Sequence, residues 1–200
     1  RQVNSIGYIS SDLHVHSGTS FDNTFSDQER VRSFAAEHAE VMVSSEHDLP
    51  TDFNPIIARM GLADSMVSIP ASEVTSLLPT KRLPYTSGHV NFFPYPPEPL
   101  EFARGMVNHE DKRMREIIAH VREKHPEALV QLNHPRNDLT LSGELPNDYE
   151  DHINKGEFLE HMGVAGHPYQ PDLPIDSRPN NTLIEADPET GLRDIDFDIL

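Results

Sequence analysis

Apolar and polar positions alternate along the chain in a way that predicts short strands separated by helices. Runs rich in β-branched and aromatic residues predict strands at residues 8–16, 41–43, 65–74, 89–95 and 128–132. Apolar residues at helical spacing predict helices at 26–39, 53–61 and 110–124, between these strands. A polar, proline-rich stretch follows, with a possible helix at 149–162 and two last strands at 182–186 and 197–200. This alternation is typical of an α/β fold with a largely parallel sheet or barrel.

Local signals fix the ends of some of these helices. The sequence Ser26-Asp27-Gln28-Glu29 has the Ser-x-x-Glu form of a capping box, which predicts that the first helix begins there. Gly61 is placed to end the second helix. In the third, Met114, Ile117 and Val121 share one stripe, which predicts a face that packs on a core.

Composition limits the class of protein. The 200 residues fit one domain, and the net charge of −17 disfavours nucleic acid or an anionic membrane as a partner. No apolar run is long enough to span a membrane, so we expect a soluble protein, either cytoplasmic or exported, that acts on a small molecule. With no cysteine in the chain, thiolate metal sites are excluded, whereas 12 histidines supply many imidazole ligands.

Side chains that can bind metal ions follow several predicted strands. His14 and His16 end the first strand, His47 follows the second, and Glu73 and His134 lie at the ends of later ones. In parallel α/β folds the functional residues gather at these strand ends. Two histidines spaced i, i+2 on a strand lie on one face, with their backbones about 7 Å apart, so both imidazoles can reach one ion.

Each of these residues also has a structural interpretation. His14 and His16 can be ordinary strand residues, Asp22 can stabilise its loop through local hydrogen bonds, and Glu73 can be a buried paired acid. The remaining candidates have structural interpretations as well. His47 can be a turn residue, and His89 can simply open a strand. His134 can belong to a turn before proline, and Arg136 can form a local ion pair. His120, within the third helix, is interpreted as a surface residue.

Five motifs, taken in order, resemble those of one enzyme superfamily. They are DLHVHS at 12–17 with Asp22, SSEHD at 44–48, Glu73 within IPASEVTS, GHVNFF at 88–93 and LNHPR at 132–136. This wording and order resemble the PHP (polymerase and histidinol phosphatase) superfamily of metal-dependent hydrolases, with the closest similarity to its carbaryl hydrolase-like branch. The resemblance extends over nearly all of residues 8–200.

The resemblance implies a fold and a set of ligands. The fold is a distorted (β/α)7 barrel of the TIM-like type, with up to three zinc, manganese or iron ions at the strand ends. His14, His16 and Glu73 would hold the first ion, and Glu73 would bridge to a second. The full set of implied metal ligands is His14, His16, Asp22, His47, Glu73, His89 and His134, with Asp22 and His47 at a third ion. Imidazole and carboxylate ligands suit these borderline divalent metals.

The expected function is metal-dependent hydrolysis, most commonly of phosphoesters in that superfamily. Carbamate, ester or amide hydrolysis on the same site is the alternative, and a non-catalytic metal- or ligand-binding module is the alternative from another class. The residues expected to take part in catalysis are Glu73, His47, Asp48 and Arg136, with Asp48 orienting His47 and Arg136 clamping an anionic group of the substrate. The superfamily's late Asp-x-His motif has no counterpart before Leu200. We therefore expect that these 200 residues are the amino-terminal portion of the domain, without its last strand or strands. The oligomeric state is left open.

Overall fold

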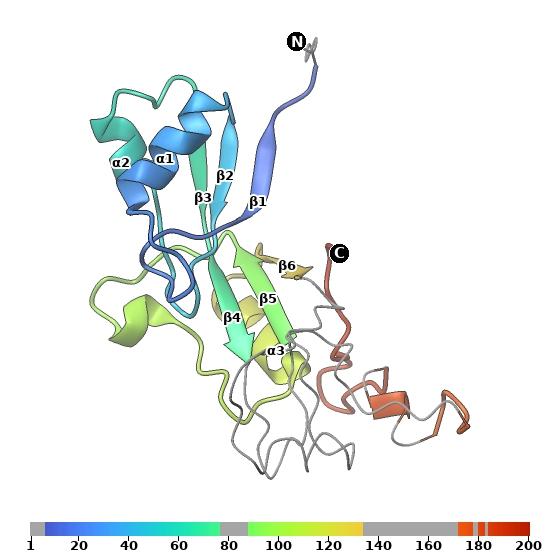
Figure 1. The fold of residues 1–200 in the computed structure, drawn as a ribbon. Helices are drawn as coiled ribbons and strands as arrows, with labels where there is room; N and C mark the ends of the chain where they lie inside the picture. The colour runs from blue at the N-terminus through green and yellow to red at the C-terminus, as the bar shows by residue number, and fades with distance from the viewer. Residues whose placement is uncertain (1–6, 77–87, 134–171, 178–179, 183) are drawn as a thin grey trace, which may run out of the picture. The chain divides into compact units, whose positions relative to one another are not determined.

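The computed structural model describes residues 7–76, 88–133, 172–177, 180–182 and 184–200. These residues form a mixed α/β structure with two three-stranded sheets, which confirms the predicted α/β class (Figure 1). No closed barrel is formed within the described residues. The chain divides into two compact units, residues 1–73 with 91–106 and residues 74–90 with 107–200. The prediction of a single domain stays a prediction.

The first sheet contains three parallel strands in chain order, β1 (Ser11–Val15), β2 (Val41–Ser44) and β3 (Val67–Pro70). Helices α1 (Asp27–Ala36) and α2 (Asn54–Arg59) connect them and lie on the same face of the sheet (Figure 1). The core between sheet and helices consists of Val15, Val31, Met42, Phe53, Ile57 and Met66. Two consecutive strand–helix–strand units therefore carry the strand ends of this sheet to one edge.

The predicted capping box at the start of α1 is confirmed. The Ser26 hydroxyl accepts a hydrogen bond from the backbone N–H of Glu29, and the Glu29 carboxylate accepts one from the backbone N–H of Ser26. Hydrogen bonds from the side chain and then the backbone of Ser26 lower the pKa of Glu29. The helix ends at Ala36 rather than at residue 39, because His38 adopts a left-handed conformation with φ of 59°. Helix α2 is followed by Gly61 at φ of 71°, as expected for a helix-ending glycine.

The prediction of one continuous strand over residues 65–74 is wrong. The structure has two strands there, β3 and β4 (Ser72–Ser76), which belong to different sheets. Pro70, the last residue of β3, has no backbone N–H to donate to a ladder. The next residue, Ala71, instead exchanges two backbone hydrogen bonds with Thr51. The break places Glu73 at the start of a new strand.

The second sheet has the order β4, β5 (Gly88–Phe93) and β6 (Leu129–Leu132). All six residues of β5 are buried, and the strand ends before Pro94. Helix α3 (Met114–Lys124) begins later than residue 110, because Asp111 has a φ of 55° and the Glu116 carboxylate caps the backbone N–H of Arg113. Two short 3₁₀ helices are η1 (Phe102–Gly105) and η3 (Asn180–Thr182).

The last two predicted strands, at 182–186 and 197–200, are largely absent from the described residues. The strand at 182–186 is wrong for the described residues: Thr182 ends η3, and the side-chain amide of Asn180 donates to the backbone carbonyls of Leu173 and Pro174. Such local bonds favour turns over strands. At 197–200 only Ile199 pairs, in a single parallel bridge with Gln131. The predicted helix at 149–162 lies outside the described residues.

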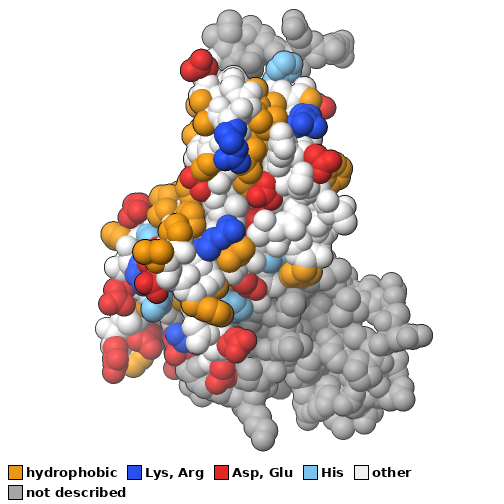
Figure 2. All heavy atoms as spheres, turned by 90° about the vertical axis from the view of Figure 1, so that its left-hand side faces the viewer, with side chains coloured by type: hydrophobic (Ala, Val, Ile, Leu, Met, Phe, Trp, Pro, Cys, Tyr) orange, Lys and Arg blue, Asp and Glu red, His pale blue; other side chains and the backbone are white. Residues whose placement is uncertain are grey.

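Carboxylate side chains dominate the charged groups on the face shown in Figure 2, where a few Lys and Arg side chains are scattered among them. This agrees with the net charge of −17. None of the helices in the described ranges is long and apolar enough to cross a membrane.

Candidate metal centre

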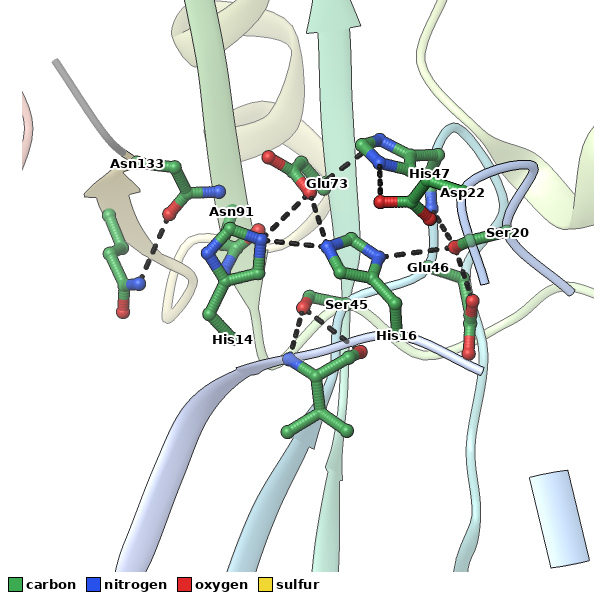
Figure 3. Close-up of polar contacts among 12 residues, drawn as sticks. His14, His16, Ser20, Asp22, Ser45, Glu46, His47, Glu73, Asn91 and Asn133 are labelled. Carbon is green, nitrogen blue, oxygen red and sulfur yellow. Dashed lines mark hydrogen bonds and ion pairs between the residues drawn. The ribbon is translucent and has the colours of Figure 1, made fainter. Parts of the chain in front are cut away.

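The side chains of His14, His16 and Glu73 converge on one point (Figure 3). The Nε2 atoms of the two imidazoles are 2.8 Å apart, and each lies 3.0 Å from Oε2 of Glu73. Glu73 is fully buried, whereas the side chains of His14 and His16 are 28% and 15% exposed. The structure therefore brings together the three residues predicted to hold the first ion, and the two histidines are the partly exposed members of this group.

A local irregularity in β1 directs the two histidines to this point. The pairing of β1 with β2 shifts register between Asp12 and Val15. In the irregular segment the backbone N–H of His14 donates to the Asp12 carboxylate at 3.0 Å, and the carbonyl of Leu13 accepts from the Asn91 side-chain amide at 3.0 Å. Bulges of this kind re-aim side chains beside functional sites. Asp12, Leu13 and Asn91 thus help to hold the backbone around His14.

His47 and Asp22 form a second group beside the first. His47 Nε2 lies 3.3 Å from the Asp22 carboxylate, and its Nδ1 lies 3.5 Å from Glu73 Oε2. The His47 ring is stacked between the rings of His16, at a centroid distance of 4.4 Å, and Phe21, at 4.5 Å. A parallel bridge between His47 and Glu73 sets the backbone positions of both residues. His16, Asp22 and His47 are also close enough together to share an ion.

The loop at residues 17–26, which carries Asp22, is held at several points. Its ends are joined by a hydrogen bond from the backbone N–H of Gly18 to the carbonyl of Phe25. A Cβ atom at Gly18 would lie 2.9 Å from that carbonyl oxygen, so the close approach requires glycine. The Ser17 hydroxyl also contacts the carboxylate of Asp27, the first residue of α1, at 2.6 Å. Asp22 is therefore presented by a loop with fixed ends.

The donor set fits a divalent cation. Two ligands that each bond one zinc ion at 2.0–2.2 Å lie at most about 4.4 Å apart, and the three atoms of the first group are within 3.0 Å of one another. Protons alone satisfy them poorly, because two Nε2–H groups aimed at one oxygen would oppose each other across 2.8 Å. The carboxylates of Glu73 and Asp22 add negative charge to the two neighbouring ligand groups, which a bound cation would balance.

The acidic surroundings change the pKa of His16. Burial of the imidazole lowers this pKa, but the hydrogen bond and negative charge of Glu73, together with the charges of Asp22 and Glu46, outweigh burial and raise it above 6.5. A metal ion must therefore displace a proton from His16 at pH values where an ordinary histidine is already neutral.

We expect the apparent affinity for zinc or manganese to fall as the pH is lowered, beginning above pH 6.5. Each ligand proton that must be released lowers the affinity by about tenfold per pH unit below its pKa. The measurement is a competition titration with a chromogenic chelator at a series of pH values from 8.5 to 5.5. An affinity that stays constant from pH 8 to pH 6 would contradict the assignment of His16 as a ligand.

The other predicted site residues are Asp48, His89, His134 and Arg136. Asp48 has a φ of 52°, and its backbone N–H donates to the carbonyl of Glu73 at 2.9 Å, so its backbone helps to position that residue. Its role in orienting His47 stays a prediction. His89 is fully buried on β5 in the second unit. His134 and Arg136 lie outside the described residues.

Sequence reasoning gave no role to three residues that surround the site. Glu46 is fully buried and contacts Ser17 and Ser20, and Phe21 is 70% exposed while its ring covers His47. A signal for Glu46 was present, because it directly precedes His47 at a strand end in the SSEHD motif. Nothing in the pattern of the loop distinguished Ser20 or Phe21 from their neighbours.

Comparison with known proteins gives no assignment from similarity. No protein-family model matches the chain, and no curated protein matches it in sequence. The functional argument therefore depends on the residues of the site.

Proposed function

We propose that this protein is a metal-dependent hydrolase of the PHP type that acts on a small phosphoester substrate. The observation that carries the proposal is the convergence of His14 Nε2, His16 Nε2 and the fully buried Glu73 carboxylate within 3.0 Å of one another. Asp22 and His47 extend this group to a second set of ligands on the same side. Order in the chain, ligand types and geometry all agree with the resemblance drawn from the sequence.

The proposed fold is the distorted (β/α)7 barrel. Its support is the first sheet, in which two strand–helix–strand units run in sequence and give three parallel strands in chain order. This is how a parallel barrel begins. The candidate ligands lie at or just after the ends of β1 and β2 and near the start of β4.

Within this proposal the residues have distinct tasks. His14, His16 and Glu73 would hold a first divalent ion, Glu73 would also contribute to a second, and Asp22 and His47 would belong to a third. His89 and His134 are proposed as ligands to the second ion. Ions held there supply Lewis acidity toward water and toward a phosphoryl oxygen of the substrate.

The side chains around the candidate ligands contribute rigidity and an aromatic surface to the site. His47 is stacked between two rings and lies close to two carboxylates, so the plane of its ring is fixed. Phe21 places an exposed aromatic surface beside His47, which would exclude water from one side of the bound substrate. Arg136 is proposed to bind an anionic group of the substrate.

The test combines metal analysis with turnover. The purified protein, loaded with manganese or zinc, should hydrolyse a nitrophenyl phosphate faster than the matching acetate ester or carbamate. His14→Ala should lose both metal and activity, because it removes one of three converging ligands. His120→Ala, a histidine on α3 far along the chain from these ligands, should lose neither.

The other outcomes are informative. Preferential turnover of the ester or carbamate would replace the phosphoesterase assignment with the alternative hydrolase. Metal bound without turnover of any of the three substrates would favour a non-catalytic metal-binding module. Full metal content in His14→Ala would contradict the ligand assignment.

A further inference from the structure

Glu46 is a buried acid that the proposed mechanism does not use. It belongs to the SSEHD motif, is fully buried, contacts Ser17 and Ser20 of the loop after β1, and is not among the expected metal ligands. One carboxylate oxygen, Oε1, accepts a hydrogen bond from the backbone N–H of Ser17 at 2.8 Å and is also bonded to the Ser17 hydroxyl. The other oxygen, Oε2, is bonded to the hydroxyl of Ser20. A buried carboxylate with this many partners has a fixed orientation.

The Ser20 hydroxyl in turn contacts three partners, which is as many hydrogen bonds as a hydroxyl can form. Besides Glu46 Oε2 it contacts Nδ1 of His16 at 3.1 Å and the backbone N–H of His47 at 3.0 Å (Figure 3). A hydroxyl donates one hydrogen bond and accepts two. The backbone N–H of His47 can only donate, and an ionised carboxylate can only accept. The hydroxyl proton therefore goes to Glu46, and the remaining contact must be donated by Nδ1–H of His16.

We propose that Glu46 acts through Ser20 to hold His16 in the tautomer with its proton on Nδ1. In this tautomer the lone pair of Nε2 faces His14 and Glu73, where the proposed cation binds. The metal-binding consequence rests on the proposed function, whereas the tautomer itself does not. Glu46 and Ser20 are thus positioning residues, comparable to the hydrogen-bond partners that orient metal-bound histidines in many proteins.

The backbone of Glu46 positions the third member of the same group. Its carbonyl accepts hydrogen bonds from the backbone N–H of Glu73 at 3.0 Å and from the Ser72 hydroxyl at 3.1 Å. Its side chain, through Ser20, sets the ring of His16. Glu46 therefore helps to position the backbone of Glu73 and, through Ser20, the imidazole of His16.

The tautomer can be read directly from the metal-free protein. Long-range ¹H–¹⁵N correlation spectra at pH 9, where the imidazole is neutral, distinguish a protonated Nδ1 from a protonated Nε2. The His16 signals are assigned by their loss in His16→Gln. We expect the proton on Nδ1. A proton on Nε2 would overturn the inference, since it would mean that Ser20 donates to His16 and that Glu46 is protonated.

Two variants test whether Ser20 enforces this state. Ser20→Ala should give a mixture of His16 tautomers and weaken zinc binding by about 10- to 100-fold. Ser44→Ala is the matched control, because Ser44 is equally buried but its hydroxyl donates to the carbonyl of Thr51, away from the ligands. It should change neither property. An unchanged tautomer and zinc affinity in Ser20→Ala would overturn the inference.

The inference and the proposed function can fail separately. If zinc titration of the wild-type protein at pH 7.5 shows no binding while His16 carries its proton on Nδ1, the metal-dependent function is wrong and the positioning role stands. If Ser20→Ala does not fold, the tautomer of the wild-type protein decides the question alone.

Discussion

Glu73→Gln is expected to lower the affinity for zinc or manganese by more than about 100-fold and to abolish hydrolysis. Loss of a partner that merely orients a ligand already costs about 10- to 100-fold, so loss of a direct carboxylate ligand should cost more. Glu73 also contacts three imidazoles, at 3.0, 3.0 and 3.5 Å, and is the one fully buried acid in the ligand group. The amide keeps the size of the side chain but removes the charge and replaces one acceptor with a donor.

The measurement is metal content after dialysis, together with turnover of the phosphate substrate at saturating metal. Glu127→Gln, at an exposed position before β6, makes the same chemical change and should alter neither. Retention of wild-type affinity in Glu73→Gln, with a native circular dichroism spectrum, would refute the metal site as described.

Asp194→Ala is expected to lower the free energy of unfolding by about 3–5 kcal/mol, the cost of breaking a buried ion pair by removing one partner. The Asp194 carboxylate is 3% exposed. It accepts from the guanidinium of Arg113 and from both the backbone N–H and the guanidinium of Arg115. Arg115 is itself buried, at 6% exposure, so the variant removes a carboxylate from beside a buried cation.

Urea unfolding followed by circular dichroism measures this loss. Asp176→Ala removes an exposed aspartate and should change the stability by no more than about 0.5 kcal/mol. A loss below 1 kcal/mol in Asp194→Ala would show that the pair contributes little, as most exposed ion pairs do.

The parts of the fold that were predicted correctly depend on local chemistry. The capping box at Ser26 and the helix-ending Gly61 act through neighbours in sequence, so both were visible in the pattern. The division of residues 65–74 into two strands was not, because the exchange of hydrogen bonds between Ala71 and Thr51 joins positions twenty residues apart. The start of α3 after residue 110 was not predicted either, because it depends on the left-handed backbone conformation of Asp111.

The candidate site likewise combines residues that the sequence could predict with residues that it could not. His14, His16 and Glu73 could be proposed as ligands from the sequence because metal chemistry restricts ligands to few residue types, and because each lies near the end of a predicted strand. Ser20 and Glu46 were missed since hydrogen-bonding serines and acids occur throughout the chain, and only their placement gives them a role. The bulge that aims His14 also has no sequence signal beyond Asp12, whose carboxylate accepts the backbone N–H of His14.

The anchored loop at 17–26 has a thermodynamic consequence. Closing a loop around an ion costs conformational entropy when the loop is mobile beforehand, at roughly 1–2 kcal/mol per residue ordered. Here the Gly18–Phe25 hydrogen bond, the Ser17–Asp27 bond and the capping box at Ser26 order the segment while the chain folds. The loop that carries Asp22 is therefore ordered before a cation binds. Cation binding then does not have to offset the conformational entropy of ordering this loop.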